Sequence, residues 1–225
     1  MVPWLPILIF GGFLALVIVI FAYSQYLARK RQEAMQAVAD ELGFEFKAEV
    51  PAGLTEEFER LPLFSRGRHR KVYNLLEGTT SNLRVQIFDY RFTTGAGKNQ
   101  STYNQTVICM RSRSLKLPVF TLQPEHFLHR IGEWFGIKDI NFESHPNFSR
   151  SYHLISPQEE LVRALFTPEV LEFFEEHPGH WVEAGGQLWV LYRPNVKIPP
   201  EQIRDTLQEA FEIFAQFRND RPVES

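Results

Sequence analysis

The chain begins with an uninterrupted apolar stretch. Residues Val2–Tyr23 include no charged side chain, and Trp4 and Tyr23 lie near the two ends of the stretch. At about 1.5 Å per residue, a helix from Trp4 to Tyr23 is about 28 Å long, close to the ~30 Å hydrocarbon core of a bilayer. Aromatic side chains at both ends suit the headgroup level. The pattern predicts one transmembrane helix.

A cleaved signal peptide and a buried core helix are the alternatives. Signal peptides begin with basic residues and have a shorter apolar core, whereas here the basic residues Arg29, Lys30 and Arg31 follow the apolar stretch. We therefore expect a retained anchor over residues 1–28. Trp4 and Tyr23 lie near the two ends of its apolar stretch, and the three basic residues follow it. The positive-inside rule places the N-terminus outside the inner membrane and the remaining chain in the cytoplasm.

The helical pattern continues beyond the apolar stretch. Small and apolar residues recur at three- and four-residue spacing between Gln25 and Leu42, and Gly43 follows as a candidate helix terminator. We predict a juxtamembrane helix over residues 29–43 that continues the membrane helix without a flexible linker.

The middle of the chain alternates as strands do. Strands are expected at residues 44–50, 71–76, 83–93, 101–111 and 117–122, with a short helix within residues 51–60. The turn Gly95–Asn99 joins the third and fourth of these strands into a hairpin. Leu83–Thr93 carries apolar residues on both faces, which indicates a central strand covered on both sides or packed on a partner.

The last third of the chain contains several helix-start signals. They are Gln123-Pro124-Glu125, Ser156-Pro157-Gln158-Glu159, Thr167-Pro168-Glu169 and Pro200. Trp181–Tyr192 is expected to be a hairpin that turns at Gly185-Gly186. The order predicts an α+β fold with a mostly antiparallel sheet over residues 44–218. We favour one body with a candidate seam at residues 136–147, followed by a disordered tail at 219–225.

Charge is absent from residues 1–28 and sorted in the rest of the chain. Residues 29–140 carry 17 basic and 13 acidic side chains, and residues 141–225 carry 7 and 14, which together give the net charge of −3. With no second long apolar stretch, the chain is not a polytopic transporter, and its 20 Phe residues argue against disorder.

The basic half contains two clusters besides the one at the anchor. A binding role for anionic lipid is one interpretation because the cytoplasmic leaflet is negatively charged; solvated loop charge is the other. Nucleic-acid binding is disfavoured by the negative net charge. The residues that we assign to lipid or anion binding are Arg66, Arg68, His69, Arg70, Lys71, Arg111 and Arg113.

Known chemical motifs have little support. Thr94–Lys98 lacks the Gly spacing of a phosphate loop, and Asn99 stands where a magnesium-binding Ser or Thr is needed. His126 and His129 are spaced for a shared metal but lack a third ligand. Cys109, between apolar neighbours, is expected to be a buried hydrophobe. No metal or cofactor is expected.

Asp89 is the unusual residue. It lies between Phe88 and Tyr90 on the expected central strand, where a carboxylate is costly unless paired. It is expected either to pair with Arg91 or with a basic loop, or to serve a ligand or catalytic role. The second case describes a membrane-proximal enzyme that acts on an anionic substrate with Asp89 and the basic loop at residues 66–71.

Several segments together resemble a family of uncharacterised bacterial membrane proteins. They are Leu63–Arg68, Asn74–Gly78, Phe88–Tyr90 with Thr93–Lys98, Phe148–Ser156 and Leu165–Leu171. The resemblance implies a membrane-tethered cytoplasmic domain of bacterial origin, and it carries no catalytic residue to transfer.

These observations favour a binding or scaffold module at the inner membrane surface over an enzyme. Its partner is expected to be another membrane protein, anionic lipid or a second copy of the chain, and the oligomeric state is not predicted.

Overall fold

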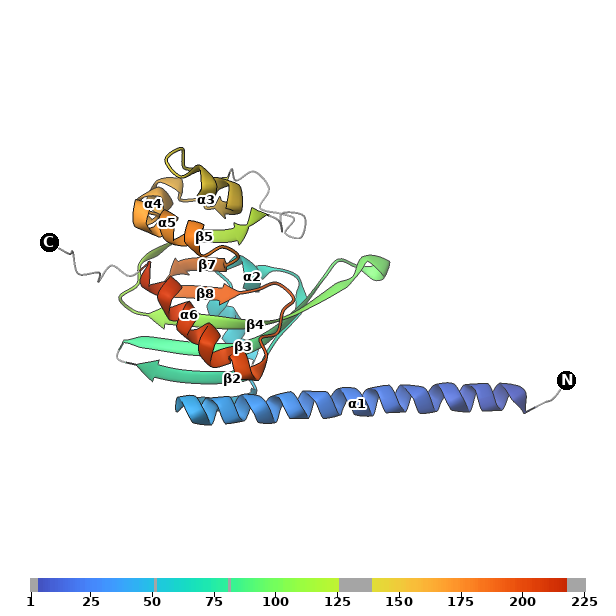
Figure 1. Cartoon of the computed structure of the whole chain (residues 1–225). Coiled ribbons are helices and arrows are strands. Elements are labelled where there is room, and N and C mark those ends of the chain that lie inside the picture. The colour runs from blue at the N-terminus through green and yellow to red at the C-terminus, as the bar shows by residue number, and fades with distance from the viewer. Residues whose placement is uncertain (1–3, 51, 81, 126–138, 218–225) are drawn as a thin grey trace.

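A long N-terminal helix leads into the body of the molecule. The computed structural model describes residues 4–50, 52–80, 82–125 and 139–217. Helix α1 runs without a break over Leu5–Leu42, 38 residues, and its N-terminal half projects away from the body (Figure 1). Gly43 ends the helix with φ 70°, a left-handed conformation that glycine adopts without strain. One continuous helix therefore covers both the apolar stretch and the segment that follows it.

The body is built on one eight-stranded sheet, in the order β1-β2-β3-β4-β8-β7-β5-β6. Every neighbouring pair is antiparallel, so the predicted α+β class is confirmed. The strands are β1 Glu45–Glu49, β2 Arg68–Thr80, β3 Leu83–Thr94, β4 Ser101–Ser112, β5 Leu117–Pro124, β6 Tyr152–Ile155, β7 Trp181–Gly186 and β8 Leu188–Tyr192.

Helices cover both faces of this sheet. Helix α6 crosses the strands at the front in Figure 1, and α3, α4 and α5 gather near β5. The remaining elements are η1 Ala52–Phe58, α2 Pro62–Ser65, η2 Gly97–Asn99, α3 Pro146–Ser151, α4 Glu159–Leu165, α5 Pro168–Glu176, η4 Pro200–Gln202 and α6 Ile203–Ala215. Proline in the first turn of α5 and of η4, which leads into α6, agrees with the predicted helix starts.

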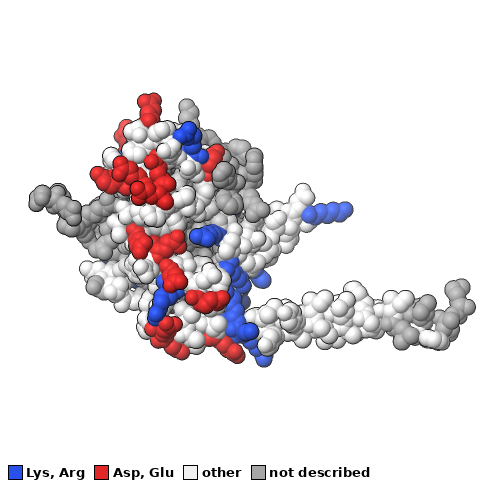
Figure 2. Space-filling view, in the orientation of Figure 1, with Lys and Arg blue, Asp and Glu red and all other residues white. Residues whose placement is uncertain are grey.

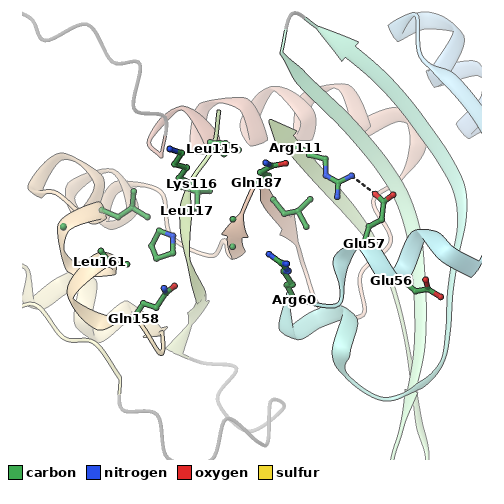
Figure 3. A pocket seen from close by; sticks show the side chains of 16 residues that line it. Glu56, Glu57, Arg60, Arg111, Leu115, Lys116, Leu117, Gln158, Leu161 and Gln187 are labelled. Carbon is green, nitrogen blue, oxygen red and sulfur yellow. Dashed lines mark hydrogen bonds and ion pairs between the residues drawn. The ribbon is translucent and has the colours of Figure 1, made fainter. Parts of the chain in front are cut away.

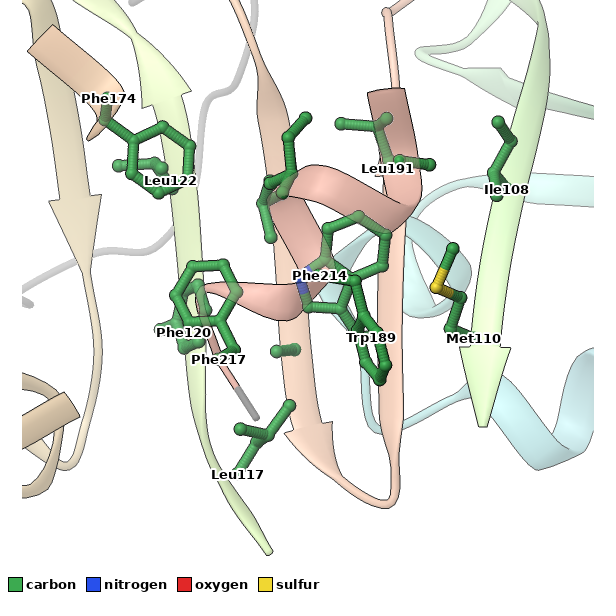
Figure 4. Packing of buried hydrophobic residues seen from close by; sticks show 14 of the residues in the cluster. Ile108, Met110, Leu117, Phe120, Leu122, Phe174, Trp189, Leu191, Phe214 and Phe217 are labelled. Carbon is green, nitrogen blue, oxygen red and sulfur yellow. The ribbon is translucent and has the colours of Figure 1, made fainter. Parts of the chain in front are cut away.

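Strand β3 divides the core into two apolar clusters, as its two-faced pattern predicts. Val85 and Ile87 pack in the cluster that includes α1 and α6 residues. Phe88 and Tyr90 pack on the other face, against side chains from η1 and α2. In the first cluster, shown in Figure 4, the ring of Phe214 lies 5.5 Å from that of Trp189. Alternation places successive side chains on opposite faces, so one strand supplies both layers.

Some expected elements differ in the structure. Gln123 and Pro124 end strand β5 instead of opening a helix, because they pair with His153 and Tyr152 of β6. The rest of that expected helix lies at residues 126–138, outside the described residues, as does the tail at 219–225. Helix α4 begins only at Glu159, because Ser156 Oγ accepts a hydrogen bond from the Gln158 N–H at 2.8 Å before the first turn.

Candidate functional site

The N-terminal part of α1 leaves its apolar side chains uncovered. Phe10, Phe13 and Phe21 are each more than 60% exposed, and the neighbouring aliphatic residues are similarly bare. Within the described residues, α1 is the one helix long and apolar enough to cross a membrane, with a mean hydropathy of 1.9 over its candidate segment. An apolar surface of this size is unfavourable in water, so this segment is a candidate membrane span.

The base of this helix is joined to the body by an ion pair at Asp89. The carboxylate of Asp89 is fully buried, and the side chain of Arg31 is only 16% exposed. Arg31 donates from Nε to Oδ2 and from Nη2 to Oδ1, both at 2.7 Å. This two-pronged geometry is the strongest form of a side-chain ion pair.

Two neighbouring strands complete the shell around Asp89. Asn74 Nδ2 donates to Oδ2 at 3.1 Å, and Thr106 Oγ1 donates to Oδ1 at 2.9 Å. Asn74 has φ 52° and lies where the β2–β3 register shifts; a bulge of this kind re-aims a side chain. Lys197 Nζ lies 4.0 Å from Oδ2 as a second, more exposed cation. Both carboxylate oxygens are therefore satisfied.

Arg31 also connects the helix to the segment between β8 and α6. Its Nη1 donates to the Ile198 carbonyl at 3.0 Å, while the Ile198 N–H donates to Thr106 Oγ1 at 3.0 Å. On the same face of α1, Met35 and Ala39 are fully buried in the core. The base of α1 is thus part of the body and does not act as a tether lying beside it.

This arrangement identifies the partner of Asp89. The pairing is with Arg31, not with Arg91, whose side chain is exposed further along β3. Arg68 lies opposite Thr93, four residues along β3 from Asp89, which is about 13 Å along a strand. Arg68 therefore lies away from Asp89, and the buried carboxylate has no exposed surface for a substrate.

The basic residues assigned to lipid binding lie at two distant ends of the β3–β4 hairpin. Arg68, His69 and Lys71 are exposed near its turn, whereas Arg111 and Arg113 lie at the other end of β4. The separation along the strand is about 30 Å. Some of the set are already paired within the body: Arg70 bonds Glu59 and the Phe64 carbonyl, and Arg111 bonds Glu57. The predicted patch is therefore divided.

A second buried carboxylate was not recognised in the sequence. Glu183 is 1% exposed and accepts hydrogen bonds from the Leu63 N–H at 2.9 Å and from the Tyr192 hydroxyl at 2.7 Å. Burial raises the pKa of Glu183, and burial together with this carboxylate raises the pKa of Tyr192. These two hydrogen bonds join α2, β7 and β8 within the core, so we assign Glu183 a structural role.

His180 is another buried titratable group. Its Nδ1 lies 3.7 Å from a carboxylate oxygen of Glu209. Burial, with a smaller contribution from Arg193, lowers the pKa of His180 to about 4, so the imidazole is neutral at pH 7 and this contact is not an ion pair there. Among the described residues, no group of three or more His, Cys, Asp or Glu side chains is arranged to hold a metal ion.

A large cavity lies away from Asp89, which is not among its lining residues. It has a volume of about 1000 Å³ and opens between η1, the β4–β5 connection, the β7–β8 turn and α4 (Figure 3). Leu117, Leu161 and Leu188 supply apolar surface, and the Glu57–Arg111 pair, 2.6 Å long, lies on its wall. Its described lining contains neither histidine nor cysteine, and its charged residues are Glu56, Glu57, Arg60, Arg111 and Lys116.

Comparison with known proteins shows that the fold resembles that of a solved structure. No family model matches the chain, and no curated protein matches its sequence. Among solved structures, the crystal structure of the mycobacterial trehalose monomycolate transport factor A, TtfA, is similar with a TM-score of 0.59 and 15% sequence identity. The match covers 88% of this chain and 99% of that chain. At this identity the likeness establishes the shared fold.

Proposed function

We propose that the chain is a single-pass bacterial inner-membrane protein whose cytoplasmic body binds a partner in the same membrane. The N-terminus lies outside, and α1 enters the cytoplasm at Arg29 and Lys30, which are exposed next to the apolar segment. The observation that carries the proposal is the continuous α1 helix, fixed to the body by the Arg31–Asp89 pair.

A fixed helix has a physical consequence for binding. A flexible linker would let the body tumble above the bilayer, and a partner would have to restrict that motion on docking. Here α1 and the sheet form one unit, so the orientation of the body about the helix axis is set before binding. Such preorganisation reduces the entropy lost on association. A module built this way favours partners that are themselves oriented by the membrane.

The similar structure supports a binding role in a general way. TtfA is named as a transport factor, which is compatible with a binding or scaffold role. Its named lipid is not assigned to this chain. The burial of Asp89 supports binding over the enzyme alternative, because that alternative requires the carboxylate to reach a substrate.

The proposal is tested by rotating the body about α1. Two alanines inserted after Ala28 rotate the body by about 200°, whereas four alanines rotate it by only about 40° beyond a full turn while displacing it further along the axis. Each full-length variant is captured from native membranes, and co-purifying integral membrane proteins are quantified. We expect a specific membrane protein with the wild type and the four-alanine variant, and its loss with the two-alanine variant.

Two results contradict the proposal. Recovery of no specific membrane protein by the wild type rules out a stable binding partner in that membrane. Equal recovery by both insertion variants shows that orientation about α1 does not matter and that the continuous helix has another purpose. Membrane fractionation of each variant checks that all of them reach the membrane in equal amounts.

A further inference from the structure

The β3–β4 hairpin extends beyond the rest of the sheet. Strand β8 pairs with β4 only over Val107–Arg111, and the pairing of β2 with β3 reaches no further than Thr93. Residues 95–102 are all exposed. Figure 1 shows the hairpin turn projecting from the body in the direction of the N-terminal half of α1. The turn thus points toward the side on which α1 would enter a membrane.

The distance that the hairpin extends along α1 can be estimated from the Arg31–Asp89 contact, which serves as the common starting point on α1 and β3. Along α1, Tyr23 lies eight residues before Arg31, about 12 Å. Along β3, Thr94 lies five residues after Asp89, about 17 Å, and still advances about 12 Å if the strand is inclined by about 45° to the helix. At that inclination, the turn reaches the level of Tyr23, where the apolar segment ends.

The chemistry of the hairpin end suits an anionic surface. The turn contains Lys98, and Arg68, Lys71 and Arg91 lie at its base. Within the described part of the chain, none of these four residues forms an ion pair, although Arg68 donates to the Gln100 side chain at 3.3 Å. The sequence has no acidic residue between Asp89 and Glu125. Figure 2 shows basic side chains where α1 leaves the body and at the end of the hairpin, while acidic side chains predominate over the rest of this face.

From this geometry we propose that the end of the β3–β4 hairpin is a second membrane contact, which binds the headgroups of anionic lipids through Lys98, Arg68, Lys71 and Arg91. The inference rests on the proposed function, because it requires α1 to span the bilayer. With α1 as one contact and the hairpin as another, the body is held against tilting as well as against rotation. Basic side chains near an anionic leaflet are attracted to it within about a Debye length, ~8–10 Å at ordinary salt.

The experiment uses the full-length protein in nanodiscs, with an environment-sensitive fluorophore attached at a single introduced cysteine. The probe sites are Ala96→Cys in the hairpin turn, Ser114→Cys at the opposite end of β4, and Phe21→Cys in α1. The native Cys109 is fully buried, and burial raises the pKa of its thiol to about 12, so it does not compete for the label. Quenching by headgroup-labelled lipid is measured in zwitterionic bilayers and in bilayers with about a third phosphatidylglycerol.

We expect the Ala96 probe to be quenched in anionic bilayers, less in zwitterionic ones and less at about 0.5 M salt, where the Debye length is shorter, while the Ser114 probe is not quenched. The charge reversal Lys98→Glu with Arg91→Glu should reduce the Ala96 quenching by about half or more, since it replaces attraction by repulsion. The matched reversal Arg113→Glu with Lys116→Glu, at the far end of the hairpin, should leave it unchanged.

The outcomes separate this inference from the proposed function. A quenched Phe21 probe with an unquenched Ala96 probe overturns the hairpin contact alone. Equal Ala96 quenching in both lipid compositions, or an equal effect of the two charge reversals, overturns recognition of anionic headgroups. An unquenched Phe21 probe shows that α1 is not inserted and overturns both.

Discussion

Removing the charge of Arg31 should detach α1 from the body at a large cost in stability. The substitution Arg31→Met keeps an unbranched aliphatic side chain but leaves the buried Asp89 carboxylate without its two-pronged partner. Loss of one member of a buried pair costs about 3–5 kcal/mol. Asn74 and Thr106 still donate to the carboxylate, and Lys197 is 4.0 Å away. We therefore expect a value near the lower limit, about 3 kcal/mol.

The assay is thermal unfolding of the full-length protein in detergent, followed by the fluorescence of the buried Trp181 and Trp189. For a body of this size, about 3 kcal/mol corresponds to a fall in Tm of roughly 6–12 °C. Hydrogen exchange adds a local readout, because amides of residues 32–42 should lose protection more than those of β4 and β8.

A second ion pair of α1, exposed on the surface, provides a matched control. Arg204 of α6 pairs with Glu41 of α1 at 2.6 Å, but both side chains are more than half exposed. The substitution Arg204→Met should cost about 1 kcal/mol or less. If Arg31→Met lowers the Tm no more than Arg204→Met does, the Arg31–Asp89 pair does not hold α1 to the body, and its assigned role is refuted.

Three further predictions concern buried groups. The pKa of Glu183 is raised by burial, so the folded state binds the proton more tightly than the unfolded state does, and stability should fall as pH rises above about 4.5 through the folded pKa. Glu183→Gln should flatten the profile of the urea midpoint against pH above about 4.5, and parallel profiles would count against this. The pKa of His180 is lowered to about 4, so its contribution to stability should be lost as pH falls from about 6.5 to 4; the His180 ring resonances should stay at their neutral-form shifts down to about pH 5, and a full titration above about pH 6 would disprove burial of a neutral ring. Cys109 is fully buried with a thiol pKa raised to about 12, so a thiol reagent should label it only on unfolding; labelling of the native protein at the unfolded rate would contradict the packing of β4.

Local patterns were sufficient for the elements whose stability is decided by neighbours in sequence. The periodicity of α1, the turn at Gly95–Asn99 and the Thr167-Pro168-Glu169 helix start all have the predicted structures. The Gln123-Pro124-Glu125 prediction was wrong because a proline in this local sequence can end a strand as well as begin a helix. There the pairing with β6, about thirty residues later in the chain, determines the structure.

The candidate site was only partly predictable for the same reason. Arg31 was grouped with Arg29 and Lys30 at the membrane, yet it lies three residues after Ala28 and four before Met35, on the apolar face of the helix. That position was a signal that Arg31 faces the body. Asp89 stood out as a buried acid, but its partner lies 58 residues earlier in the chain, and only the docking of α1 on the sheet brings them together. Glu183, bonded to the backbone of Leu63 across 120 residues, had no local signal at all.

The central claim is that α1 and the body form one rigid unit at the membrane. It is tested most directly by measuring the distance between two spin labels with double electron–electron resonance in the full-length protein in nanodiscs. One label is attached at Gln25→Cys, on the exposed part of α1, and the other at Arg113→Cys, on the body. Both sites are exposed. We predict a single narrow distance distribution that broadens when Asp89 is replaced by Asn. A broad distribution in the otherwise unaltered protein would contradict the claim.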